Sequence, residues 1–223
     1  MTALSSVPTR TIATAIGDAA TRWCDADFPP RVRVTDDIAA RTGYSVPAVE
    51  FALDALFGEL RTDAFLTTIA RELGDPAALD GPAAHIRPLG RVAILSSRTT
   101  IGVAIPAMCF ALCAKNDVLV KDREDRLVTA FSESLAQEHD AFARALEIAT
   151  WDSQIEGDRL QGAAAIVVYG SDETVARVTA DNSGSARTIG FGSRTSIGYL
   201  DAATQASPAE LRAALAGAAR DSS

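Results

Sequence analysis

The 223-residue sequence predicts an α/β fold in which a helical N-terminal layer precedes a parallel sheet. Two observations indicate this. Residues 1–80 carry apolar side chains at helical spacing, and from Gly90 onward short apolar runs alternate with helical patterns. Strands that alternate with helices are typical of βαβ units with right-handed crossovers. We therefore expect a helical segment over residues 1–80 and a Rossmann-like lobe over residues 81–223.

The N-terminal layer contains four predicted helices. An Ala-rich helix over Thr11–Trp23 is expected to end at Phe28-Pro29-Pro30, because proline fixes φ and has no N–H to donate. A short helix that ends near Thr42 should follow. The later elements of the layer are a helix after the cap residue Ser45, a helix over Thr62–Leu73, and a Gly- and Pro-containing linker over Leu79–Pro88.

The second lobe contains five short apolar runs that predict strands. They are Val92–Leu95, Asp117–Lys121, the run that starts at Ala163, Arg187–Phe191 and Ile197–Leu200. The connections are predicted to be a buried helix over Ile101–Ala114, a long amphipathic helix over Leu127–Ile148, a polar connection over Trp151–Gln161, and a last helix over Ser207–Ala219.

Composition narrows the range of partners and locations. The net charge of −8 argues against nucleic acid and anionic membranes as partners. The longest uncharged run, Thr99–Ala114, falls short of the roughly 20 residues that span a bilayer. The first residues lack the apolar core of a signal peptide, and three cysteines without framework spacing fit a reducing compartment. We therefore expect a cytoplasmic protein that binds neither nucleic acid nor membranes.

The sequence AAAIVVYGSDETVARV, Ala163–Val178, is the main candidate for a ligand site. An apolar strand reaches Gly170 and Ser171 and turns directly into a helix. The first N–H groups of such a helix favour an anion, typically a phosphate, and ligands of open α/β sheets lie at the carboxyl ends of the strands. The alternative is an ordinary strand-to-helix turn with a capping residue and no ligand.

Lys121 and Glu124 form a second candidate, since Lys121 ends a predicted strand and Glu124 follows three residues later. A lysine and a carboxylate at a strand end can hold ribose hydroxyls through charge-assisted hydrogen bonds. A solvated charged turn would have the same spacing.

The other reactive residue types carry no recognisable site. Cys109 and Cys113 share one face of an apolar helix, which is typical of core cysteines, and Cys24 is interpreted in the same way. His85 and His139 have no cysteine or histidine at metal-ligand spacing. The sequence Gly190-Phe191-Gly192 lacks the third glycine of a dinucleotide fingerprint. No metal site is expected.

Several segments together resemble the acyl-CoA reductase family, the relatives of the fatty acyl-CoA reductase of bacterial bioluminescence, within the aldehyde dehydrogenase superfamily. The resemblance is carried, in order, by RTGYSVPAVEFALDALFGELR with RELGDPAALDG, GRVAILSS, IPAMCFALCAKNDVLVKDRED, WDS, AAAIVVYGSDETVARV and ARTIGFGSRTSIGYL. It covers nearly the whole chain. It implies a Rossmann-like sheet of the aldehyde dehydrogenase cofactor-binding type, with NADP or NAD as cofactor and an acyl-CoA as substrate of the intact family.

The resemblance also implies roles for individual residues. Lys121 and Glu124 match the superfamily's K-x-x-E, which holds the adenosine ribose of the cofactor. Gly170 and Ser171 match its Gly-Ser near the pyrophosphate and nicotinamide. Gly190 stands where hydrolytic members carry a glutamate that activates water. A glycine cannot act as a base, which favours transfer of the acyl group to a thiol such as CoA.

Two departures from the sequence pattern of the family and its superfamily bear on activity. Arg98 stands where the superfamily's oxyanion-binding asparagine is expected, and loss of an oxyanion donor typically costs about 10²–10³ in rate. The family's nucleophilic cysteine follows the segment that LRAALAGAARDSS resembles, and Cys24, Cys109 and Cys113 lie far upstream of it.

Two hypotheses follow for the function. In the first, the chain is the NAD(P)-binding portion of an acyl-CoA reductase-like protein, with no turnover by itself. In the second, it is a truncated or degenerate relative that acts as a binding or assembly module. In both, absence of the lobe that carries the family's catalytic cysteine would expose an apolar interface, so self-association is expected.

Overall fold

A computed structural model gives the architecture of the chain and describes residues 2–81, 86–97, 100–122, 126–152, 156–182, 184, 186–194 and 207–221. Two compact units are present, Met1–Gly192 and Ser193–Ser223. The first unit holds the helical layer and the whole described sheet. The second holds the helix α10 (Pro208–Asp221). The expected strand over Ile197–Leu200 lies outside the described residues.

The helical layer consists of four helices and one 3₁₀ turn. They are α1 (Thr9–Trp23), α2 (Pro29–Thr42), α3 (Val46–Gly58), α4 (Thr62–Leu73) and η1 (Pro76–Leu79). The helix predicted after Ser45 is confirmed as α3, in which Val49 and Leu53 are buried, whereas Val46 is exposed. Ser45 precedes α3, but its side chain makes no capping hydrogen bond.

The prediction that Phe28-Pro29-Pro30 ends a helix was wrong, because the two prolines begin one. Helix α1 stops at Trp23, and Pro29 and Pro30 occupy the first positions of α2. The first N–H groups of a helix have no intrahelical partner, so proline loses nothing there and its fixed φ already suits the helix. Helix α2 ends at Gly43, whose φ of 76° is a left-handed conformation that glycine tolerates.

Five parallel strands form the sheet: β1 (Arg91–Leu95), β2 (Asp117–Lys121), β3 (Leu146–Ala149), β4 (Ala165–Tyr169) and β5 (Arg187–Phe191). Their order in the sheet is β3-β2-β1-β4-β5. The chain moves outward from β1 through β2 to β3 and then crosses back to β4 on the other side of β1. The switch point of the topology therefore lies between β1 and β4, the place where open α/β sheets bind ligands.

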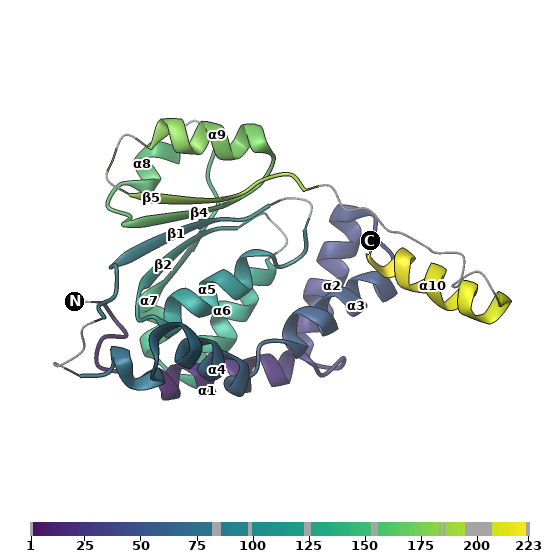
Figure 1. Ribbon diagram of the computed structural model, residues 1–223, viewed down its shortest axis with the longest axis horizontal. Helices are drawn as coiled ribbons and strands as arrows, with labels where there is room; N and C mark the ends of the chain where they lie inside the picture. Colours follow the sequence, from purple (N-terminus) through teal and green to yellow (C-terminus); the bar gives the residue numbers. More distant parts are fainter. Residues whose placement is uncertain are drawn as a thin grey trace. The chain divides into compact units, whose positions relative to one another are not determined.

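Helices cover both faces of the sheet, as Figure 1 shows. One face carries α5 (Ala104–Cys113), α6 (Leu127–Glu138) and α7 (Ala141–Ala145), and the other carries α8 (Glu156–Leu160) and α9 (Asp172–Asp181). Alternate strand residues serve the two faces: Ile94 and Val120 join the core under α5 and α6, while Leu95 and Leu119 join the core under α9. The alternation follows the two-residue repeat of a strand.

The prediction of one long helix over Leu127–Ile148 was wrong. It is divided into α6, which ends at Glu138, the one-turn helix α7, and strand β3. Leu146 and Ile148 continue the apolar spacing of the helix, but they also alternate with Glu147 as strand residues do. Pairing with β2 decides between the two, since Val118 faces Leu146 and Val120 faces Ile148 in register. The polar connection expected over Trp151–Gln161 likewise contains a short helix, α8.

The helical layer shares one core with the sheet. Trp23 of α1 is fully buried, stacks at 4.9 Å from Phe57 of α3 and lies 6.0 Å from Phe131 of α6, measured between ring centroids. Its indole N–H donates to the Ser134 hydroxyl at 3.0 Å. The helices of residues 1–80 thereby pack on the helices that cover the sheet. None of the helices in the described residues combines the length and apolar character needed to cross a membrane.

Candidate functional site

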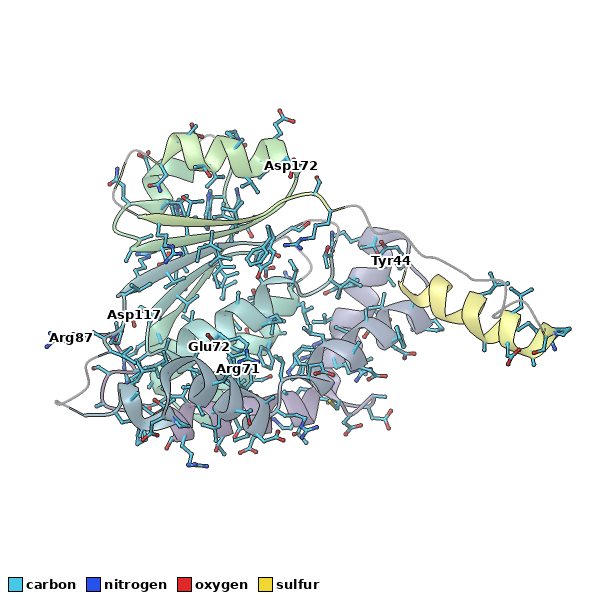
Figure 2. All side chains as sticks on the ribbon, viewed as in Figure 1. Tyr44, Arg71, Glu72, Arg87, Asp117 and Asp172 are labelled. Carbon is cyan, nitrogen blue, oxygen red and sulfur yellow. The ribbon has the colours of Figure 1, made fainter. Side chains whose placement is uncertain are left out.

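The carboxyl ends of the five strands define the candidate site. Figure 2 labels Asp172 at the start of α9, next to this edge, and Asp117 at the amino-terminal start of β2, on the opposite edge. The residues that end or directly follow the strands gather at the first of these edges. They are Ser96 after β1, Lys121 and Asp122 after β2, Trp151 after β3, Gly170 and Ser171 after β4, and Gly192 after β5.

Lys121 is the buried cation of this edge. Only 3% of the residue is exposed, and its Nζ atom lies 5.1 Å from the centroid of the Trp151 ring. A cation over an indole face is attracted by the ring quadrupole, more strongly where water is excluded. The pairing of β2 with β3 brings these two residues together from positions 30 apart in the sequence.

Asp122 is a buried carboxylate beside Lys121. Its Oδ2 accepts a hydrogen bond from the Thr129 hydroxyl at 3.0 Å, and its main-chain N–H donates to the Ala149 carbonyl at 2.9 Å. The second contact continues the ladder between β2 and β3 by one residue. Asp122 therefore joins the ends of these two strands to the first turns of α6.

Trp151 is nine-tenths buried, with 8% of the residue exposed. It packs in the core under α9, and the Arg159 guanidinium of α8 lies 6.0 Å from its ring centroid. No described residue accepts a hydrogen bond from its buried indole N–H. An indole nitrogen can only donate, so an unoccupied donor remains at this edge.

Gly170 and Ser171 form the turn from β4 into α9. The Ser171 hydroxyl accepts the N–H of Thr174 at 3.2 Å and thus caps the helix. A Cβ atom on Gly170 would lie 3.1 Å from the Thr174 side chain, so a larger residue there would require Thr174 to move by a few tenths of an ångström. The turn therefore has the geometry of an ordinary capped strand-to-helix turn, and it also lies beside the switch point of the sheet.

The structure brings Lys121 and the Gly170-Ser171 turn to the same edge of the sheet. They end β2 and β4, which are separated by β1 alone. Since neighbouring strands lie about 4.8 Å apart, the two strand ends are roughly 10 Å from each other. A ligand of dinucleotide length spans that separation. Glu124, predicted to act with Lys121, and Arg98 lie outside the described residues.

Gly190 lies in β5 opposite Val168 of β4. A Cβ atom at position 190 would run into Cγ1 of Val175 on α9. A larger side chain at this position therefore needs the Val175 side chain to move. The next residue, Phe191, stacks on Tyr169 with ring centroids 4.8 Å apart and planes inclined by 12°.

The three cysteines are poor nucleophiles in their positions. Burial raises the pKa of Cys109 well above its ordinary value, with a smaller contribution from Cys113, and burial raises the pKa of Cys113 to about 12. Burial also raises the pKa of Cys24, although Arg31 opposes the shift. A thiol needs its thiolate form to attack, so none of the three is activated.

One of the two histidines, His139, lies in the described part of the chain. His139 accepts a hydrogen bond from the Ala141 N–H at 3.1 Å and helps join α6 to α7. His85 lies outside the described residues. Over the ranges that the structure describes, no three His, Cys, Asp or Glu side chains are grouped so that they could hold a metal ion.

Solved structures with a similar fold are aldehyde dehydrogenases. They include the glyceraldehyde-3-phosphate dehydrogenase GapN of Methanocaldococcus jannaschii complexed with NADP, at 11% identity and a TM-score of 0.63 over 84% of this chain and 42% of that one. An NAD-dependent benzaldehyde dehydrogenase of Corynebacterium glutamicum has 13% identity and a TM-score of 0.63, over 84% of this chain and 42% of that one. The succinic semialdehyde dehydrogenase of Streptococcus pyogenes in complex with NADP⁺ has 10% identity and a TM-score of 0.63, over 83% and 41%.

These likenesses give the class: the chain has an aldehyde dehydrogenase-like α/β fold and spans about two fifths of the length of those structures. No curated protein matches the sequence at a significant level. A family profile described as acyl-CoA reductase (LuxC) matches residues 4–223. The chain therefore belongs to the acyl-CoA reductase family.

Sequence reasoning missed two residues of the candidate site, Trp151 and Asp122. The sequence pattern predicts a polar connection at Trp151, because the residues of β3 also fit the end of a long helix. A signal is present, because Leu146, Glu147 and Ile148 alternate between apolar and polar as strand residues do. Asp122 follows Lys121 in a run of charges, and its burial depends on β3, which the sequence pattern did not separate from α6.

Proposed function

We propose that this chain binds a nicotinamide cofactor, NADPH or NADH, across the carboxyl edge of its sheet, as the cofactor-binding portion of an acyl-CoA reductase. The observation that carries the proposal is the strand order β3-β2-β1-β4-β5. It puts Lys121 and the Gly170-Ser171 turn on either side of β1, next to the switch point. Membership of the acyl-CoA reductase family and the fold of dehydrogenases solved with NADP support it.

The donors at the edge suit a dinucleotide. The Lys121 ammonium, with three N–H donors, would hold the hydroxyls of the adenosine ribose together with the Glu124 carboxylate. Gly170 leaves the backbone bare where the chain would approach the pyrophosphate, and Ser171 begins the helix whose N-terminus favours negative charge.

The reaction proposed for the intact protein converts an acyl-CoA, NAD(P)H and a proton into an aldehyde, CoA and NAD(P)⁺. When bound, the cofactor supplies the hydride that reduces the acyl carbon. Gly190 leaves no carboxylate to activate water at its position, which supports release of the acyl group to a thiol rather than as an acid. The raised thiol pKa values of Cys109 and Cys113 make the residues of this chain unsuited to carry the acyl group.

Titration of the purified chain with NADPH and NADH by calorimetry tests the proposal. We expect saturable binding of the cofactor by the wild type. Lys121→Met should weaken the affinity about 10- to 100-fold, because a hydrogen bond from a charged group contributes about 1.5–3 kcal/mol. Methionine keeps the buried stem, so the melting temperature serves as the check on folding. Arg144→Ala removes a charge from an exposed pair on α7 and should leave the affinity unchanged.

The alternative is a binding or assembly module without cofactor. Arg98 in place of the expected oxyanion asparagine favours it, together with cysteines that are not activated. Absence of any NADPH or NADH binding up to millimolar concentration would support this alternative and overturn the proposal.

A further inference from the structure

Trp151 has a feature that the cofactor-site residues proposed above do not explain. Its indole N–H is buried and no described residue accepts it. The other tryptophan of the chain, Trp23, is also buried but donates to the Ser134 hydroxyl at 3.0 Å. Leaving a buried donor unpaired costs about as much as a lost hydrogen bond, so an acceptor atom supplied by a bound ligand would stabilise this residue.

The surroundings of the Trp151 ring are cationic. The Lys121 Nζ lies 5.1 Å from the ring centroid, and the Arg159 Cζ lies 6.0 Å from it. Arg159 also approaches the Glu147 carboxylate at 4.0 Å, so its charge is partly balanced. A ring with two cations near its centroid and a free N–H donor favours an acceptor that carries negative charge or several lone pairs, such as a phosphate or a ribose hydroxyl.

The position of Trp151 in the sheet limits which part of a ligand it can contact. It follows β3, the outer strand beyond β2, whereas Gly170 and Ser171 follow β4 on the other side of β1. A dinucleotide that lies across this edge has one half over β2 and β3 and the other over β4. Trp151 lies with Lys121, on the side proposed for the adenosine half.

We propose that Trp151 is a further cofactor-binding residue. Its indole N–H donates a hydrogen bond to a ribose or phosphate oxygen of the adenosine half, and its ring positions the Lys121 ammonium for the same half. The inference rests on the proposed function, because it assigns a residue to that cofactor site.

The substitution Trp151→Phe tests the hydrogen bond, since phenylalanine keeps an aromatic face for Lys121 and removes the donor. We expect NADPH or NADH, whichever the wild type binds, to bind about tenfold more weakly, the fold-change of one lost hydrogen bond. The half-ligand 5′-AMP should lose affinity by the same factor, and nicotinamide mononucleotide should lose none. A merely structural role would weaken both halves alike.

Tryptophan emission gives a second readout. In Trp23→Phe, Trp151 is the only tryptophan, and 5′-AMP should change its emission on binding. Because 5′-AMP does not absorb tryptophan emission, the change reports on contact. If Trp23→Phe does not fold, the difference between the emission of wild type and of Trp151→Phe serves instead.

The outcomes separate the two proposals. If the wild type binds neither NADPH nor NADH, the proposed function fails and this inference fails with it. If the wild type binds and Trp151→Phe binds equally well, or loses affinity for both half-ligands equally, the assignment of Trp151 is overturned while the proposed function stands.

Discussion

A methyl group at position 190 would meet Cγ1 of Val175, because α9 passes close over β5 at this residue. Gly190 therefore has a packing role in addition to the chemical one inferred from its place in the superfamily. The two roles are compatible. A larger side chain at position 190 would have to displace Val175, so a packing contact and the absence of a water-activating base coincide at the same residue.

We expect Gly190→Ala to destabilise the protein by about 1 kcal/mol, the low end of the cost of overpacking, since the added methyl forces the Val175 side chain to move at an exposed position. Urea unfolding followed by circular dichroism measures the change. Gly157→Ala is the matched control: Gly157 lies in α8, a Cβ there would meet nothing within 4 Å, and alanine favours helix. Equal stability of Gly190→Ala and the wild type would contradict the packing role.

At the scale of elements, a buried ion pair connects the helical layer to the sheet lobe. The Lys115 Nζ, on a side chain that is 3% exposed, lies 2.7 Å from Asp80 Oδ1. The same carboxylate accepts the Thr9 N–H at 2.9 Å and the Thr9 hydroxyl at 2.8 Å. Asp80 thereby joins the first residue of α1 to the turn between α5 and β2.

Burial raises the pKa of Asp80, but the hydrogen bonds from Lys115 and Thr9 outweigh it and leave that pKa below its ordinary value. A carboxylate with a lowered folded pKa stabilises the fold above its unfolded pKa, about 3.9, and this contribution is lost as the pH falls through the folded value.

We expect Asp80→Asn to lower the free energy of unfolding at pH 7 by about 1.5–3 kcal/mol, because Lys115 loses its charged partner. The difference from the wild type should shrink below about pH 4, where the wild-type carboxylate also becomes neutral. Urea titrations over a pH series measure it. Asp63→Asn, in the exposed pair with Arg61, should change little. A difference that stays constant down to pH 2 would contradict the linkage.

At the scale of the whole molecule, the expected self-association remains a prediction. Strand β5 ends the described sheet, and its Ile189 and Phe191 are 40% and 38% exposed. An edge strand with apolar side chains can pair with a second copy of the chain. We expect light scattering to give a mass that rises with concentration.

Ile189→Lys should reduce this association, because a charge on an edge strand opposes pairing. Leu89→Lys is the control, since Leu89 is 63% exposed just before β1, away from β5. A monomeric mass at every concentration, or the same behaviour in both variants, would show that β5 is not an association surface.

The elements that the sequence predicted well are those whose pattern admits one interpretation. Strand β2 and β5 have the predicted bounds, and so does α4. The errors have local causes. Pro29-Pro30 suits both the end and the start of a helix, and Leu146–Ile148 fits both a helical stripe and a strand. Local spacing cannot choose in such cases, because the deciding interactions are with residues far away in the chain.

By itself, the sequence determined the class of fold, the parallel strands and the membership of the acyl-CoA reductase family. It also led to Lys121, Glu124, Gly170 and Ser171 as candidates for the cofactor site. The tertiary structure alone decided the strand order, the existence of β3 and the meeting of Lys121 with Trp151. The physical reason is that strand pairing joins residues distant in sequence, and only burial shows that the Trp151 donor has no partner among the described residues.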